Sequence, residues 1–211
     1  MEIIFENPQI LVCVKPAGIL SQADSRGGES MVSLLGTHTG AAVYPIHRLD
    51  KPVGGVMAYA KTERAAAFLS RAVQEGTFRK EYLAILRSAP REPAGRLTDL
   101  LYHDPKRNKT YVVERKRKGV REAALDYETV AAAEGMTLVR VRLLTGRTHQ
   151  IRAQFASRGL PLAGDGPYGG GSGAMGLWSA RLQFPSPGGG MLEFSRLPAG
   201  GPWGLFGEEL P

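Results

Sequence analysis

Short runs of apolar residues, bounded by turn residues, recur along the chain and predict β-strands. Residues 3–5 and 10–14 are two such runs, and the Glu6, Asn7 and Pro8 between them favour a turn. We therefore expect a pair of strands at the start of the fold. The same signals predict further strands at residues 56–60, 78–86, 125–130, 137–144, 178–184 and 191–194.

Between residues 62 and 75 the apolar positions follow a helical period instead. They recur every three or four residues, at Ala65, Phe68, Leu69, Ala72 and Val73. A threonine at the start and a glycine just past the end are suitable caps, so we predict a helix that buries this stripe. Shorter helices are predicted at residues 29–35 and between the turn at 145–149 and Gly159. The strand alternation favours an α+β fold with a mixed, largely antiparallel sheet and flanking helices.

Positive charge is concentrated between residues 106 and 121. Against Glu114 alone, this segment carries Lys106, Arg107, Lys109, Arg115, Lys116, Arg117, Lys118 and Arg121. The Tyr-Val-Val at residues 111–113 divides the basic residues into two groups, which indicates a basic hairpin projecting from the sheet. A charge run is most often a solvated loop. Here the whole chain has a formal net charge of +7, which favours contact with phosphate groups.

Length and composition limit the class of protein. A chain of 211 residues with 43% hydrophobic residues can form the core of one domain, and we interpret residues 1–211 as one domain without a separate N-terminal RNA-binding domain. Cys13 is the only cysteine, so the chain has no internal disulfide and no cysteine-based zinc site. We find no secretory leader and no apolar stretch of about 18 residues. We therefore expect a cytoplasmic monomer that does not bind a membrane.

Asp50 is the carboxylate that its neighbours single out. Arg48 and Lys51 flank it, and prolines at residues 45 and 52 restrict the backbone on both sides. The glycines at 54 and 55 allow a bend or the close approach of another chain segment. An ordinary Asp-Lys-Pro surface turn is the alternative interpretation.

Two further segments carry candidate chemistry. Strand alternation puts Lys80 and Tyr82 on one face of the strand at 78–86. The turn before the last predicted helix places Arg147 near a helix N-terminus, where the helix dipole disfavours a cation unless an anion is close. Either Asp50 or a phosphate is the expected companion of Arg147.

Taken together, the Asp50 loop, the Lys80-Glu81-Tyr82 strand and residues 145–152 closely resemble the three motifs of RluA-type pseudouridine synthases. The strings His-Arg-Leu-Asp and Gly-Arg-Thr-His-Gln-Ile-Arg are highly specific. Residues 10–20 resemble the opening strand and Lys-Pro-Ala-Gly turn of that family, and residues 178–185 resemble its closing strand. The resemblance therefore covers almost the whole chain.

Two places depart from the family pattern. Val53, Gly54 and Gly55 stand where the family commonly continues with Thr-Ser-Gly, and residues 177–180 read Leu-Trp-Ser-Ala where the closing strand commonly begins Leu-His-Ala. Neither change removes a residue that the chemistry requires. Both bear on the shape of the uridine pocket, and hence on substrate identity more than on reaction type.

The resemblance implies isomerisation of a uridine in RNA to pseudouridine. The ionised Asp50 would attack C1′ or take the C2′ proton, and Arg147 would hold that carboxylate. Tyr82 would stack on the detached uracil or present its hydroxyl near C5. No step needs a metal or a redox cofactor. The family also implies a central cleft with Asp50 at its floor.

RNA recognition follows from the same resemblance. The target uridine would be flipped out of a stem-loop in ribosomal or transfer RNA, and Arg48 would fill the vacancy. The remaining RNA contacts would come from the other basic residues of the three motifs and the basic segment, namely His47, Lys80, Arg152, Arg115, Lys116, Arg117 and Lys118.

Two other functions are alternatives to this interpretation. A non-catalytic RNA-binding protein on the same fold would tolerate the loss of Asp50. A nucleoside or glycoside hydrolase of the usual kind needs two carboxylates about 5–9.5 Å apart. Only Asp50 is singled out here, because alternation turns Glu81 away from the face that carries Tyr82.

Overall fold

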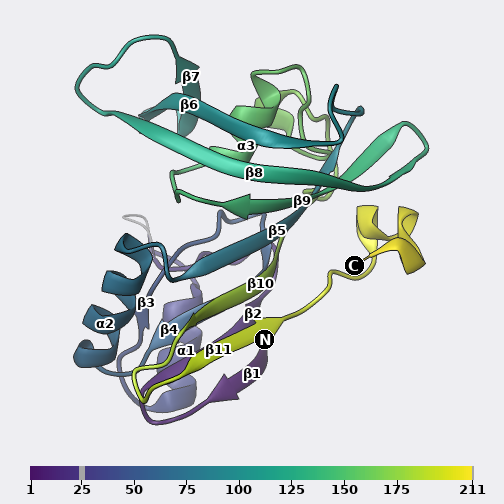
Figure 1. Ribbon diagram of the computed structural model, residues 1–211. Coiled ribbons are helices and arrows are strands. Elements are labelled where there is room, and N and C mark those ends of the chain that lie inside the picture. Colours follow the sequence, from purple (N-terminus) through teal and green to yellow (C-terminus); the bar gives the residue numbers. More distant parts are fainter. Residues whose placement is uncertain (24–26, 211) are drawn as a thin grey trace. The chain divides into compact units, whose positions relative to one another are not determined.

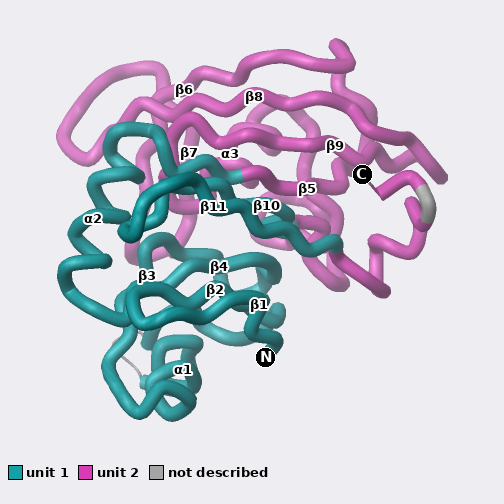
Figure 2. The backbone as a smooth tube through the Cα atoms, turned by 60° about the horizontal axis from the view of Figure 1, so that its bottom comes forward, with its two compact units in different colours: residues 1–80, 178–197 teal, residues 81–177, 198–211 magenta. Residues whose placement is uncertain are grey.

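The computed structural model describes residues 1–23 and 27–210 and divides them into two compact units. Unit 1 contains residues 1–80 and 178–197, and unit 2 contains residues 81–177 with the C-terminal segment from Pro198. Figure 2 shows the two units in different colours. The chain thus leaves unit 1 near the start of one strand, β5, and returns to it for its last two strands. The prediction that the chain is one domain stays a prediction.

The sheet of unit 1 is built from both ends of the sequence (Figure 1). Its strands are β1 (Glu2–Glu6), β2 (Ile10–Lys15), β3 (Tyr44–Pro45), β4 (Gly54–Ala60), β10 (Leu177–Pro185) and β11 (Met191–Ser195). The predicted pairing of the first two strands is confirmed, and Asn7 closes their turn by accepting from the backbone N–H groups of Gln9 and Ile10. β4 pairs antiparallel with β2 and parallel with β10, and β10 pairs antiparallel with β11.

Helix α2 (Glu63–Gln74) packs its apolar stripe into the core of unit 1. The caps are as predicted, since the Thr62 side chain accepts from the Ala65 N–H and Gly76 ends the helix in the left-handed region. The predicted burial of Phe68 was wrong, because this residue is 41% exposed. Helix α1 (Met31–Thr39) begins two residues later than predicted, where Ser30 and Ser33 form a capping box.

Unit 2 contains most of β5 (Arg79–Leu86) and the long antiparallel strands β6 (Ala94–Asp104), β8 (Val120–Ala133) and β9 (Met136–Leu143), with β7 (Lys109–Val113) paired to β6. Strand β6 was not predicted. The buried Leu97 and Leu101 lie on one face of it, but Asp99 lies between them and breaks the apolar alternation. Asp99 is accommodated there because Gln154 and Arg158 donate hydrogen bonds to it.

The structure also corrects the predicted basic hairpin. The segment is not one hairpin of its own, because β7 pairs with the unpredicted β6. Its basic residues lie mainly in two connections, the turn at 105–108 and the loop at 114–119. Helix α3 (Gln150–Ala156) follows β9 and buries Ile151 and Phe155. The α+β class with a mixed, largely antiparallel sheet is confirmed.

The C-terminal segment of unit 2 forms two short 3₁₀ helices, Gly201–Leu205 and Gly207–Glu209. They bury Trp203 and Phe206. Within the described residues, no helix is long and apolar enough to cross a membrane.

Candidate active site

The backbone around Asp50 is held by neighbours within unit 1. The Ser21 hydroxyl donates to the Leu49 carbonyl oxygen at 2.7 Å and accepts from the Leu49 N–H at 3.0 Å. On the other side, the Val53 N–H donates to the Asp50 carbonyl oxygen at 2.9 Å. Both flanks of Asp50 are therefore fixed, while its side chain is half-buried.

Lys15 lies beneath this loop and is completely buried. Its ammonium group donates to the carbonyl oxygens of Pro16, Ile19 and Lys51, at 2.9, 2.7 and 3.2 Å. Burial lowers the pKa of Lys15 to about 8, and the charge of Asp50 acts in the opposite direction. Lys15 thus stabilises the loop and places a cation near Asp50. This role of Lys15 was not predicted, although a lysine directly after a fully apolar run is a signal of it.

The two glycines after Asp50 allow β10 to approach β4 closely. Gly54 pairs with Trp178, and Gly55 pairs with Ser179. A Cβ atom on Gly55 would overlap the Ser179 backbone, and one on Gly54 would overlap the Trp178 ring. This confirms the predicted close approach of another segment. It also shows that the chain's two departures from the family pattern are in contact, since the tryptophan occupies the space that a side chain at residue 54 would need.

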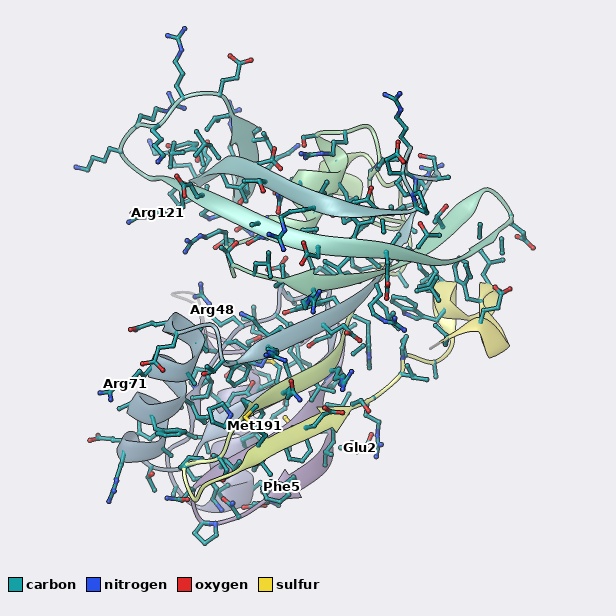
Figure 3. The ribbon with its side chains drawn as sticks, in the orientation of Figure 1. Glu2, Phe5, Arg48, Arg71, Arg121 and Met191 are labelled. Carbon is teal, nitrogen blue, oxygen red and sulfur yellow. The ribbon has the colours of Figure 1, made fainter. Side chains whose placement is uncertain are left out.

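The residues just before Asp50 alternate between the interior and the surface. His47 and Leu49 are buried, whereas Arg48 is exposed (Figure 3). The ring of His47 lies 5.6 Å from that of Phe78, between ring centroids. Lys80, from the start of β5, is also buried.

The predicted alternation is present from Phe78 to Tyr82, at the start of β5, whereas the rest of that strand is buried on both faces. Phe78, Lys80 and Tyr82 are buried, and Arg79 between them is exposed. Glu81 forms an ion pair with Arg140 at 3.5 Å. The interior face of this strand therefore carries a cation and a phenol, and Glu81 does not supply a second carboxylate to that face.

In unit 2, Gln150 organises the turn that carries Arg147. Its side-chain oxygen accepts from the Thr145 hydroxyl at 2.7 Å and from the Arg147 N–H at 3.0 Å, and its amide donates to the Ala124 carbonyl oxygen at 3.0 Å. Arg147 itself is exposed, and its Nε donates to the Glu122 carbonyl oxygen at 2.9 Å. The role of Gln150 was not predicted, because an isolated glutamine carries no signal of burial in the sequence.

The turn continues into a strained residue that a hydrogen-bonded network supports. His149 has a φ of +53°, which is uncommon for a residue with a side chain, and its Nδ1 lies 3.0 Å from the Tyr168 hydroxyl. That hydroxyl accepts from the Thr110 N–H at 2.7 Å, and the Thr110 hydroxyl donates to the Thr148 carbonyl oxygen at 2.8 Å. Strand β7 is thus tied to the turn that carries Arg147.

Arg152 is not on the surface. Its side chain is 6% exposed, and its Nε and Nη2 donate to the two carboxylate oxygens of the fully buried Asp165, each at 2.8 Å. Its guanidinium also lies over the Tyr168 ring, 4.8 Å from the centroid. At least two of its nitrogens therefore serve the fold, and its predicted contact with RNA stays a prediction.

The basic loop at 114–119 is exposed, as are all four of its predicted RNA-binding residues, Arg115, Lys116, Arg117 and Lys118. Next to it is a hollow of about 180 Å³ whose lining includes His103, Arg121 and Arg147. Arg121 projects from the start of β8 (Figure 3). The described residues contain no group of three or more His, Cys, Asp or Glu side chains that could hold a metal ion.

Comparison with known proteins identifies the family to which the chain belongs. The family model for RNA pseudouridylate synthases matches residues 9–157, more than half of the chain, and this range includes Asp50, Tyr82 and Arg147. The chain belongs to the RNA pseudouridylate synthase family. The resemblance of its three motifs to that family is therefore confirmed.

Individual relatives agree with the family match. The chain is 33% identical to the uncharacterized RNA pseudouridine synthase YhcT of Bacillus subtilis, over 82% of this chain and 59% of the relative. It is 34% identical to the ribosomal large subunit pseudouridine synthase D of Pseudomonas aeruginosa, over 81% of this chain and 54% of the relative. It thus matches somewhat more than half the length of these relatives.

A solved structure shows the same fold. Human RNA pseudouridylate synthase domain containing 1 matches with a TM-score of 0.80 at 20% identity, over 93% of this chain and 83% of that chain. At this level of identity the likeness concerns the fold, and it supports the α+β assignment made above.

Proposed function

We propose that this chain is an RNA pseudouridine synthase that isomerises a uridine of ribosomal or transfer RNA, with Asp50 as its catalytic carboxylate. The observation that carries the proposal is the family match over residues 9–157, which includes all three candidate catalytic residues. The supported backbone of the Asp50 loop is consistent with it, because a catalytic carboxylate has to be held in place while the base moves.

The reaction exchanges one glycosidic bond for another. The bond from N1 of uracil to C1′ breaks, the base rotates, and C5 bonds to C1′. C5 then loses its proton and N1 gains one, so that the atomic composition does not change. Asp50 would start the reaction by attacking C1′ or by taking the C2′ proton, and both routes require its ionised form.

Two residues of unit 2 complete the proposed chemistry. Arg147 would hold the Asp50 carboxylate in its ionised form through charge-assisted hydrogen bonds. Tyr82 would keep the detached uracil from leaving, either by stacking on it or by placing its hydroxyl near C5.

RNA would be held by positive side chains around this chemistry. The exposed Arg48 would fill the gap that the flipped uridine leaves in its stem-loop. Further contacts would come from His47, Lys80, Arg152, Arg115, Lys116, Arg117 and Lys118. We propose that the protein acts on this RNA as a monomer.

The test is pseudouridine mapping on total RNA from cells that lack this protein. Wild type should restore one or a few modified sites that Asp50→Asn does not restore. Glu81→Gln is the matched control, because it removes a carboxylate that is already committed to Arg140 and should restore the sites. Rescue by Asp50→Asn, or no missing site at all, would favour the non-catalytic RNA-binding alternative. Release of free uracil by the purified protein would favour a hydrolase.

A further inference from the structure

The hollow beside the basic loop is built from one sheet face and one turn of unit 2. Cross-strand pairing places His103 opposite Thr110 and Leu101 opposite Arg121, so all four residues are on the same face of β6, β7 and β8. The turn at 146–148 covers this face, because the Thr110 hydroxyl donates to the Thr148 carbonyl oxygen at 2.8 Å. All of these residues line the hollow, whose volume is about 180 Å³. It opens to solvent on the side of Arg121, which is exposed.

The hollow carries positive charge, and no carboxylate is among the described residues that line it. Two guanidinium groups belong to the lining, those of Arg121 and Arg147. Arg147 already donates through Nε to the Glu122 carbonyl oxygen and is the proposed partner of Asp50. Arg121, by contrast, forms no ion pair with any residue that the structure describes. Its guanidinium is therefore available to a ligand, and the planar fork of donors suits a phosphate group.

His103 contributes a hydrogen-bond acceptor to the same hollow. The Thr110 hydroxyl has one proton and donates it to the Thr148 carbonyl oxygen, so it can only accept from Nδ1 of His103, at 3.1 Å. The proton of the neutral imidazole is therefore on Nδ1, and Nε2 carries a lone pair. Within the described part of the chain, Nε2 has no hydrogen-bond partner. The ring also packs edge-on against His149, at 5.9 Å between centroids. Nε2 is thus the nitrogen left for a ligand.

The size and lining of the hollow favour a sugar-phosphate unit over a base. A volume of about 180 Å³ exceeds the roughly 30 Å³ of one water molecule and is below the roughly 300 Å³ at which pockets for whole small molecules begin. Apart from the His103 imidazole, the described lining has no aromatic ring on which a base could stack. A phosphate alone would use Arg121 but has no proton for the lone pair of His103. A ribose attached to that phosphate supplies one from its 2′-hydroxyl.

We propose that this hollow binds one ribose-phosphate unit of RNA, with Arg121 on a phosphate oxygen and Nε2 of His103 accepting from the 2′-hydroxyl. This rests on the proposed function, which makes RNA the ligand. Because DNA lacks this hydroxyl, the site distinguishes RNA from DNA through the sugar, independently of base sequence.

The test compares the binding of two fluorescent probes by anisotropy, an oligouridylate and the same oligomer with 2′-fluoro sugars. Fluorine keeps the sugar pucker of RNA but cannot donate a hydrogen bond. Wild type should bind the ribose probe more tightly. In His103→Phe the ratio of the two affinities should fall about two- to tenfold, as expected for one hydrogen bond. His38→Phe is the matched control, because His38 lies on α1 in unit 1 and does not line the hollow.

The phosphate contact is tested with the same two probes. Arg121→Met should weaken the binding of both by the same factor, about tenfold or more, because a charge-assisted hydrogen bond is lost. It should also reduce the slope of log affinity against log salt by about one. Arg91→Met is the control, because Arg91 is another exposed arginine of unit 2 and does not line the hollow.

The two contacts can fail separately. An unchanged affinity ratio in His103→Phe, or an equal loss for both probes, would overturn the contact with the 2′-hydroxyl. Equal losses in Arg121→Met and Arg91→Met would overturn the phosphate contact. If His103→Phe does not fold, wild type still tests the sugar contact, because equal affinity for the two probes would overturn it. If pseudouridine formation fails while binding still depends on His103 and Arg121, the catalytic proposal is refuted and this site stands.

Discussion

The ion pair of Arg152 with Asp165 allows a quantitative test of what holds unit 2 together. We consider Asp165→Asn, which keeps the shape of the side chain and removes its charge. Both groups are buried, at 6% and 0% side-chain exposure, and the bidentate contact has two distances of 2.8 Å. Removal of one partner leaves the guanidinium buried without its counter-ion. We expect a loss of about 3–5 kcal/mol in the free energy of unfolding.

The assay is urea unfolding followed by tryptophan fluorescence. At about 2–4 °C per kcal/mol for a chain of this size, the loss corresponds to a fall of about 6–20 °C in melting temperature. Denaturant slopes of wild type and variant should agree, so that the difference in midpoint reports stability.

The chain contains its own control in the ion pair of Arg96 with Asp126. Its geometry is the same bidentate fork, with distances of 2.6 and 3.0 Å, but the Arg96 side chain is 62% exposed. Asp126→Asn should therefore change stability little, because water screens exposed pairs. Equal losses in Asp165→Asn and Asp126→Asn would refute the conclusion that burial sets the cost.

Three further predictions follow from unit 1 and from the basic loop. Gly54→Ser should lower the free energy of unfolding in urea by about 1–3 kcal/mol, because the new side chain overlaps the Trp178 ring. Adding Trp178→His to the same chain should recover most of this loss. No recovery would show that the two positions are not coupled. Burial lowers the pKa of Lys15 from 10.5 to about 8, so between these pH values the unfolded chain binds more protons than the folded one. The free energy of unfolding of wild type, relative to that of Lys15→Met, should therefore rise with pH in this range. A flat or falling difference would contradict the lowered pKa. Charge reversal of three exposed residues should weaken RNA binding and flatten its dependence on salt, and an unchanged slope would exclude their loop from the interface. These residues are Arg115, Lys116 and Arg117.

Patterns with a short range along the chain were sufficient to predict much of the structure. Helix α2 and its two caps follow from residues within a single segment, and the first strand pair follows from two apolar runs and one turn. The three motifs were recognised for the same reason, since each is a contiguous string. Local geometry and local chemistry are encoded by neighbours in sequence.

The sequence could not decide which groups bind the polar side chains of the interior. Asp99 in β6, Gln150 beside Arg147, and Lys15 beneath Asp50 all look like surface residues when only their own neighbours are considered. Each is tolerated inside because groups remote in the chain satisfy its hydrogen bonds, such as the Lys51 carbonyl for Lys15. The contact between Gly54 and Trp178 is of the same kind.

The sequence by itself thus determined the fold class, the family and the order of the three motifs, because these depend on periodicity and on contiguous strings. Only the tertiary structure decided which polar groups are buried and which groups from remote parts of the chain satisfy them. The physical reason is that the cost of burying a polar group depends on atoms that folding brings together from distant parts of the chain. His47 shows this most clearly, since its Nδ1, which has no hydrogen-bond partner among the described residues, becomes visible only once the ring is known to be buried.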